Sequence, residues 1–247
     1  MVCRHGKVRA GRVTTGLLLN LTLALWFVAA PPARSALLTV TSTGDSGPGT
    51  LRQALLDANA NPEDADTIAF DPALAGSTIS LTSGTLLIQS PVQINGLGSS
   101  QITVERSSGS GGCIFEVLDP DHTDFSAGID GLTIKSGHAT MGGGISCLTM
   151  GTTLTISNTI VTGCTCDFEG GGIYNYFGTM LVEDCVIENN LAVQPTSAGV
   201  HSSGGGIANY GSLTMTDTIV SSNAAPKPAG SRPNIAGGIH NIGDLLM

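Results

Sequence analysis

Hydrophobic positions in the second half of this chain fall in short alternating runs that are separated by glycine-rich turns. The element Gly-Gly-Ile occurs four times, and an asparagine follows two residues later in every copy but the first, which has a cysteine. The isoleucines are 28, 34 and 32 residues apart and stand at Ile145, Ile173, Ile207 and Ile239. Self-similarity at such periods is typical of a solenoid whose coils stack on one another.

The coils that begin at Leu154, Met180 and Leu213 align without gaps, which places their apolar residues in register. Four inward-facing ladders follow from this alignment: Leu154/Met180/Leu213, Ile156/Val182/Met215, Thr159/Cys185/Thr218 and Val161/Ile187/Val220. Equivalent residues are expected about 4.8 Å apart, the spacing of paired strands. An aliphatic and hydroxyl-bearing interior suits a narrow parallel core. The sequence therefore predicts an all-β fold, a parallel β-helix.

The front of the chain predicts one strand and one short helix. Residues 36–40 are typical of an edge strand, and Thr50 with Gln53 three residues later makes a capping-box pattern. Apolar residues then follow at helical spacing, at Leu51, Ala54, Leu55 and Ala58. Asn61-Pro62 ends this helix of about two to three turns. We expect residues 36–66 to cap the open end of the solenoid, where core and strand edge are otherwise exposed.

The coils are expected over residues 67–247. Their first short strands are predicted at 67–70, 78–81, 86–88, 92–94 and 102–104, and the segments 112–118 and 129–134 lead into the repeats. A further coil begins at Leu245, and the sequence stops at Met247. We therefore expect an uncovered C-terminal coil, which favours self-association.

The asparagines of the repeats also stack in register. Asn175, Asn209 and Asn241 form one ladder, and Asn190 and Asn223 form a second. Cys147 and Cys164 hold the corresponding slots one coil earlier. A stacked asparagine at a turn bonds the backbone and its neighbour in the next coil. These residues are predicted to be structural.

The first 35 residues have the features of a signal peptide. A basic segment precedes a mostly apolar run at 16–30, and Ala33-Arg34-Ser35 offers small residues at a cleavage site. The apolar run is shorter than a membrane span requires, and no later stretch is long enough. Five of the ten basic residues and none of the nineteen acidic ones lie in this segment, so the mature chain carries 5 − 19 = −14. Such a charge excludes nucleic acid and anionic membrane surfaces as partners.

Five cysteines remain after removal of this segment, which is an odd number. Cys164-Thr165-Cys166 stands apart from any second ligand pair that a zinc site would require. We interpret the cysteines as small buried or turn residues, and the oxidising compartment permits one disulfide.

Two segments carry a resemblance to a known family. The Gly-Gly-Ile elements with Ile187-Glu188-Asn189-Asn190 and Val220-Ser221-Ser222-Asn223 resemble the polymorphic outer-membrane-protein repeat. The front segment, from Asp45 through Leu51-Arg52-Gln53-Ala54, is similar to the N-terminal signature of exported bacterial right-handed β-helix proteins. The resemblance implies a right-handed pectin-lyase-like parallel β-helix, exported and often held at the cell surface, with adhesin-like roles in some members.

The same fold carries polysaccharide lyases and hydrolases, so a carbohydrate-active enzyme is the alternative function. No Lys or Arg stands between Ser136 and Pro226 to act as a lyase base. An inverting glycosidase needs two carboxyl groups about 6.5–9.5 Å apart. Asp184 and Asp217 occupy equivalent outward positions on adjacent coils, with Glu183 beside them. These three are the candidate catalytic residues, although a solvated face is the favoured interpretation.

A second acidic segment offers a candidate calcium site. Asp119, Asp121 and Asp124 alternate with other residues on a loop, and carboxylate oxygens suit a hard cation. The segment lacks the glycine and terminal glutamate of the well-known calcium loop, so a solvated turn is the favoured interpretation. No other cofactor is expected.

An outward ladder of Ile160, Val186 and Ile219 is a candidate contact surface for a partner, although cover by a long turn such as residues 191–203 is the favoured interpretation. Taken together, these features predict an extracellular or surface-associated, non-catalytic scaffold or adhesin-like module. Its expected partners are glycans or cell-surface proteins. The alternative is a carbohydrate-active enzyme that uses the outer acidic face.

Overall fold

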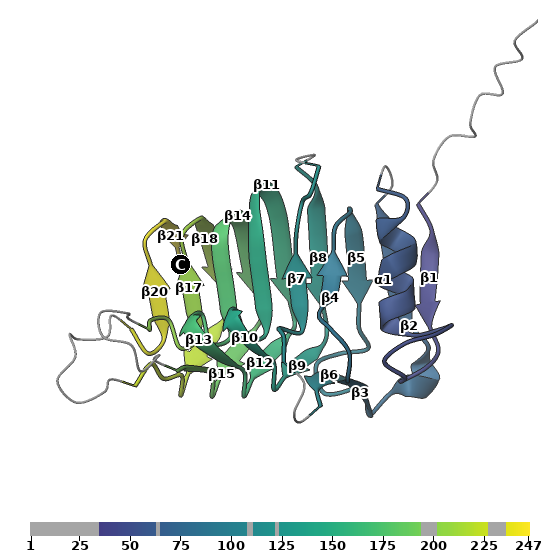
Figure 1. The fold of residues 1–247 in the computed structure, drawn as a ribbon, viewed down its shortest axis with the longest axis horizontal. Helices are drawn as coiled ribbons and strands as arrows, with labels where there is room; N and C mark the ends of the chain where they lie inside the picture. The colour runs from purple at the N-terminus through teal and green to yellow at the C-terminus, as the bar shows by residue number, and fades with distance from the viewer. Residues whose placement is uncertain (1–34, 63–64, 108–110, 122–123, 194–201, 227–235) are drawn as a thin grey trace, which may run out of the picture. The chain divides into compact units, whose positions relative to one another are not determined.

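The chain folds as a parallel β-solenoid of about seven turns, with a single short α-helix among its described residues, which confirms the predicted fold class (Figure 1). The computed structural model describes residues 35–62, 65–107, 111–121, 124–193, 202–226 and 236–247. The predicted signal peptide therefore lies, apart from Ser35, outside the described residues. Within the part of the chain that is described, no helix is long and apolar enough to cross a membrane.

The strands belong to three parallel sheets. The largest has twelve strands: β1 (Leu37–Val40), β2 (Asp66–Phe70), β4 (Leu86–Ile88), β5 (Val92–Asn95), β7 (Phe115–Val117), β8 (Ser126–Asp130), β11 (Ile145–Ser157), β14 (Ile173–Glu183), β17 (Ile207–Asn209), β18 (Ser212–Thr216), β20 (Ile239–Asn241) and β21 (Asp244–Leu246). The second has six: β3 (Ser77–Leu81), β6 (Ile102–Arg106), β9 (Thr133–Lys135), β12 (Ile160–Thr162), β15 (Val186–Glu188) and β19 (Ile219–Ser221). The third has three: β10 (His138–Met141), β13 (Thr165–Glu169) and β16 (Leu191–Ala192). The helices are α1 (Leu51–Asn59) and a 3₁₀ turn, η1 (Pro72–Leu74).

Backbone pairing puts the repeats in the predicted register. The four isoleucines of the Gly-Gly-Ile elements pair in order along the solenoid. Leu154 pairs with Met180 and Met180 with Leu213, and the ladder that contains Val161 is formed in the same way. The side chains of Leu154, Met180 and Leu213 are buried, because strand alternation turns them toward the interior.

Some predicted strands differ from those observed. The segment 129–134 is divided between β8 and β9, because Gly131 lies between them with a positive φ of 66°. The segment 112–118 contributes only β7. The third sheet was not predicted, since β10, β13 and β16 are only 4, 5 and 2 residues long.

Both asparagine ladders are hydrogen-bonded from coil to coil. Asn175 Nδ2 donates to Asn209 Oδ1 at 2.7 Å, and Asn209 Nδ2 donates to Asn241 Oδ1 at 2.6 Å. In the second ladder, Asn190 Nδ2 donates to Asn223 Oδ1 at 3.0 Å. Asn175 and Asn209 are fully buried, so their amides satisfy backbone groups that water does not reach.

Cysteines hold the same slots one coil earlier. Cys147 pairs with Asn175. The Cys164 backbone N–H donates to Asn190 Oδ1 at 2.9 Å. The sulfur atoms of Cys147 and Cys164 therefore occupy the positions that asparagine amides occupy in the following coils, and the backbone hydrogen bonds at these positions are retained.

Helix α1 forms where its apolar spacing predicts, with Leu51, Ala54, Leu55 and Ala58 buried. Thr50 caps it, since its Oγ1 accepts from the Gln53 backbone N–H at 3.2 Å. The second half of the predicted capping box is wrong. The Gln53 amide instead donates to Asp57 Oδ1 at 2.8 Å, and the Thr50 N–H bonds the carbonyl of Gly47.

The helix also satisfies the free edge of strand β4. Asn59 Nδ2 donates to the Leu87 carbonyl and Asn59 Oδ1 accepts from the Gln89 N–H, both at 2.9 Å. Arg52 Nη1 donates to the Thr85 carbonyl at 2.9 Å. These side chains bond the backbone as a neighbouring strand would, which protects an edge that is otherwise open to further pairing.

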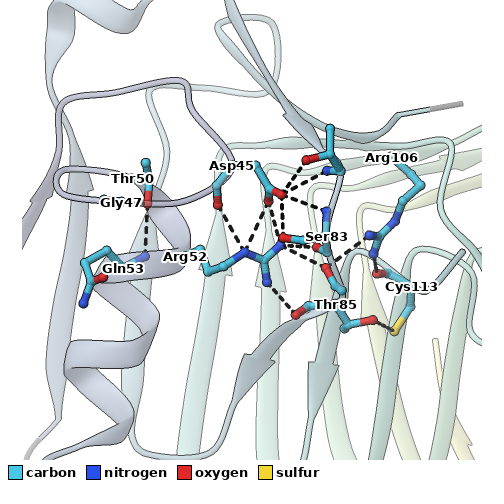
Figure 2. Close-up of polar contacts among 11 residues, drawn as sticks. Asp45, Gly47, Thr50, Arg52, Gln53, Ser83, Thr85, Arg106 and Cys113 are labelled. Carbon is cyan, nitrogen blue, oxygen red and sulfur yellow. Dashed lines mark hydrogen bonds and ion pairs between the residues drawn. The ribbon is translucent and has the colours of Figure 1, made fainter. Parts of the chain in front are cut away.

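An ion pair ties the cap to the loop after β3 (Figure 2). Arg52 Nη2 lies 2.7 Å from Asp45 Oδ1. Asp45 Oδ2 accepts from the backbone N–H groups and hydroxyls of Thr82 and Ser83. Burial raises the pKa of Asp45, but the hydrogen bonds from Ser83, Arg52 and Thr82 outweigh it and hold the pKa well below its ordinary value.

We expect Asp45→Asn to lower the free energy of unfolding by about 1–3 kcal/mol at neutral pH, since charge-assisted hydrogen bonds are lost. A carboxylate with a lowered folded pKa stabilises above its unfolded pKa of about 4, and this contribution is lost as the pH falls through the folded pKa. Urea titrations at pH 7 and pH 3 should therefore show a smaller difference between variant and wild type at pH 3. Asp57→Asn, on the neighbouring helix α1, is the control, with an expected loss of at most about 0.5 kcal/mol. Equal losses for both variants contradict the assignment.

We expect Asn209→Ala to destabilise the solenoid by about 2–4 kcal/mol, because it leaves buried partners on both neighbouring coils without a hydrogen bond. Asn241→Ala, at a less buried position of the same ladder, should cost less. Chemical denaturation of the two variants measures the difference. If the ladder contributes nothing to stability, the denaturation curves of both variants superimpose on that of the wild type.

Candidate functional site

The two aspartates predicted as a catalytic pair lie at a corner of the solenoid. Asp184 and Asp217 have positive φ angles of 50° and 48°, and Asn158 one coil earlier has 47°. Left-handed backbone of this kind favours glycine, asparagine and aspartate, because other side chains clash with the following carbonyl. The backbone conformation at this corner is by itself sufficient to explain why these residue types recur here.

A hollow of about 460 Å³ lies beside this corner, lined in part by Asp130, Asn158 and Asp184. Asp217 and Glu183 are not among its lining residues. Asp130 Oδ1 accepts from Ser157 Oγ and Asn158 Nδ2, both at 2.7 Å. The Asp130 carboxylate therefore joins two coils.

The candidate calcium residues have separate roles in their loop. Asp119 is buried, and its Oδ2 accepts from the Asp124 backbone N–H at 2.9 Å. Asp124 has a positive φ of 54°, and Asp121 is exposed. Among the described residues, which omit 122–123, no group of three or more His, Cys, Asp or Glu side chains is arranged to hold a metal ion.

Four aromatic residues gather on the outside of the coils, and we call them the aromatic face: Tyr174, Tyr176, Phe177 and Tyr210. They include all three tyrosines of the chain. The ring centroids of Tyr174 and Tyr176 are 6.2 Å apart in a stacked arrangement, and those of Tyr176 and Phe177 are 4.1 Å apart. Tyr210 lies within 6.5 Å of both Tyr174 and Tyr176. Tyr176 and Phe177 remain 43% and 46% exposed.

The asparagine ladder positions the aromatic face. Tyr174 and Tyr176 flank Asn175 on β14, so strand alternation directs both rings outward when the amide points inward. Tyr210 follows Asn209 in the next coil. Met150 of β11 pairs with Phe177 and is 65% exposed, which extends the apolar surface by one coil.

Hydrogen bonds fix one edge of the aromatic face. The Tyr210 hydroxyl donates to Glu169 Oε2 at 2.6 Å, and Ser203 Oγ donates to Glu169 Oε1 at 3.0 Å. Burial, together with Glu169, raises the pKa of the Tyr210 hydroxyl, which therefore remains a proton donor. The ring of Tyr210 also meets His240 edge-on, with centroids 5.9 Å apart.

Ser203, His240 and Glu169 come together without the geometry of a catalytic triad. Ser203 Oγ lies 2.6 Å from His240 Nδ1, and Glu169 Oε1 lies 4.0 Å from the same nitrogen. A triad needs serine and carboxylate on opposite nitrogens of the ring. Ser203 is also only 1% exposed, so its hydroxyl serves the structure.

A cleft of about 450 Å³, which we call the acidic cleft, lies beside the first coil of the repeats. Its lining includes Glu116, His138, Asp167, Cys113, Met141 and Leu148. His138 Nδ1 lies 2.8 Å from Thr165 Oγ1, and its Nε2 lies 3.8 Å from Asp167 Oδ1. Burial raises the pKa of Glu116, whose Oε2 lies 3.9 Å from Cys113 Sγ.

The cysteine of this cleft is not poised to react. Burial raises the pKa of Cys113 to about 11, so the thiol stays protonated, and the thiolate is the reactive form. Thr85 Oγ1 lies 3.6 Å from its sulfur, as Figure 2 shows. All five cysteines of the described chain are buried and free, so no disulfide joins them here.

Neither the aromatic face nor the acidic cleft was predicted from the sequence. A signal for the aromatic face is present in the sequence, since the tyrosines adjoin the asparagines that stack in register. The acidic cleft carried no such signal, because Glu116, His138 and Asp167 follow no common spacing. They meet only through the third sheet, whose strands β10 and β13 contribute His138 and Asp167.

We expect Asp184→Gly and Asp184→Asn to leave the free energy of unfolding within about 0.5 kcal/mol of wild type, because both residues tolerate left-handed backbone. Asp184→Val should cost about 1–2 kcal/mol or more, since a β-branched residue is strained there. Thermal denaturation of the three variants measures this order. A catalytic Asp184 predicts in addition that any turnover is lost in all three variants, including the two with wild-type stability.

The comparisons with known proteins add no family to this description. No protein-family model matches the chain, and no curated protein matches it. At the level of fold, the strand pairing identifies the chain as a parallel β-solenoid of about seven turns.

Proposed function

We propose that this protein is an exported, non-catalytic binding module of adhesin-like character, which presents its aromatic face to glycans. The observation that carries the proposal is the exposed cluster of Tyr176 and Phe177 on strand β14, which is paired with a strand on each side. Exposed apolar clusters of this kind mark interaction sites. Their exposure would otherwise be unfavourable on a soluble rod.

Aromatic rings suit pyranose sugars for a physical reason. The face of each ring carries partial negative charge, and the axial C–H bonds of a sugar ring carry partial positive charge. Tyrosine also supplies a large, rigid contact at low conformational cost. Tyr176 and Phe177 provide the contact area, and the Glu169 network holds the neighbouring Tyr210 in place.

Export and surface association rest on sequence features. The segment 1–35 has the pattern of a signal peptide, and the mature chain has a net charge of −14. The repeats resemble those of polymorphic outer-membrane proteins, which supports a place at the cell surface and a pectin-lyase-like relationship. Contact with cell-surface proteins remains part of this proposal.

The alternative function is a carbohydrate-active enzyme. Its sequence candidates, Glu183, Asp184 and Asp217, lie at a corner that the backbone explains. The observation that favours the alternative is the acidic cleft, because Glu116 and Asp167 place two carboxyl groups in one concavity. Catalysis releases products from a glycan and binding does not, so an assay for products distinguishes the two functions.

We expect saturable binding of one or more neutral oligosaccharides on a glycan panel, without release of reducing ends or unsaturated products. Tyr176→Ala and Phe177→Ala should each raise the dissociation constant about tenfold or more, as the loss of a central aromatic contact does. Isothermal titration calorimetry measures the constants.

The matched control is Leu56→Ala, which truncates another exposed apolar residue, on helix α1. This variant should bind as the wild type does. Glycan cleavage assigns the enzyme instead. Equal weakening by all three variants shows that the aromatic face is not the site.

A further inference from the structure

The acidic cleft is continuous with the aromatic face. Leu148 and Ser146 of β11 line the cleft. Ser146 pairs with Tyr174 in the next coil, and Met150, two residues beyond Leu148, pairs with Phe177. A ligand that stacks on the aromatic face and is long enough to cross the coil of β11 therefore reaches the cleft.

The charged side chains that face the cleft are acidic. Glu116 and Asp167 line it, and none of its lining residues is a lysine or arginine. Of the three described lysine and arginine side chains, Arg52 pairs with Asp45 and Lys135 with Glu105. Arg106 is buried in the wall of the cleft, where its guanidinium donates to the carbonyls of Gly84 and Cys113. His138 is the remaining titratable base, and it lies beside Asp167.

Glu116 is the carboxylate that gains most from a bound cation. It is half-buried, and the sulfur of Cys113 at 3.9 Å is its one hydrogen-bond partner among the described residues. A thiol is a weak donor, so it compensates poorly for the water that Glu116 loses. An ammonium group brings three N–H donors and a full positive charge to the same place.

We propose that the acidic cleft binds the ammonium group of an amino sugar, so that the preferred ligand is a cationic glycan with unacetylated amino groups. This inference rests on the proposed glycan binding and names its substrate class. An oligosaccharide of amino sugars meets both halves of the surface, because one of its residues stacks on Tyr176 and Phe177 while the ammonium group of another enters the cleft that Glu116 and Asp167 line. A uronic-acid polymer is disfavoured by the same carboxylates.

The test compares two ligands that differ at their amino groups, which are free and cationic in one and acetylated and neutral in the other. A hexasaccharide of glucosamine and the corresponding hexasaccharide of N-acetylglucosamine are titrated into the purified protein. We expect the cationic hexasaccharide to bind about tenfold tighter or more at low salt, as a charge-assisted hydrogen bond predicts. The preference should shrink at high ionic strength.

Glu116→Gln and Asp167→Asn should each reduce this preference and leave binding of the neutral hexasaccharide unchanged. Glu188→Gln, on β15 outside the cleft, is the matched control and should retain the full preference. Thermal melts establish that the variants are folded. A second pair of Glu116→Ala and Glu188→Ala repeats the comparison if either amide variant fails to fold.

Each further outcome counts for or against the inference. Equal binding of the two hexasaccharides overturns the cationic preference but leaves the proposed glycan binding intact. A loss of preference in Glu188→Gln, or equal competition by a lysine hexapeptide, shows general charge attraction and overturns the cleft assignment. Failure of every glycan to bind refutes the proposed function itself.

Discussion

The structure depends on the backbone hydrogen bonds between successive parallel coils. Each coil must present its N–H and C=O groups at the same height as the coil before it, so every turn has to return the chain to one position. The register of the four isoleucines shows that this condition holds over the whole repeat region. A single displaced turn would expose one set of side chains and bury another.

This constraint determines which residues stand at the corners. At one corner the left-handed conformation passes from Gly131 through Asn158 to Asp184 and Asp217. At the Gly-Gly-Ile corner the coils approach so closely that a Cβ atom on Gly171 would collide with the backbone of the next coil. Because the corners and the interior are both determined by stacking, only the outward positions between corners are free to vary for function. The aromatic face occupies such positions.

The sequence was sufficient to predict the repeats, the inward ladders, the asparagine stacks and the helix over 51–59, because each follows from a period or a local spacing. It was insufficient for the third sheet, since β10, β13 and β16 are only 4, 5 and 2 residues long and are held by the coils around them. The same limit applies to the site. Glu116 and Asp167 are fifty-one positions apart in sequence, and only the winding of the coils brings them to one cleft.

The N-terminal cap also has a consequence for the site. Arg52 bonds the carbonyls of Ser83, Gly84 and Thr85, which fixes the loop that leads into β4. Thr85 lines the acidic cleft beside Cys113. Arg106 joins the two walls, because it donates to the carbonyls of both Gly84 and Cys113 (Figure 2). The interactions that close the end of the solenoid thus extend to one wall of the cleft, so loss of the cap should disorder this wall before it affects the distant aromatic face.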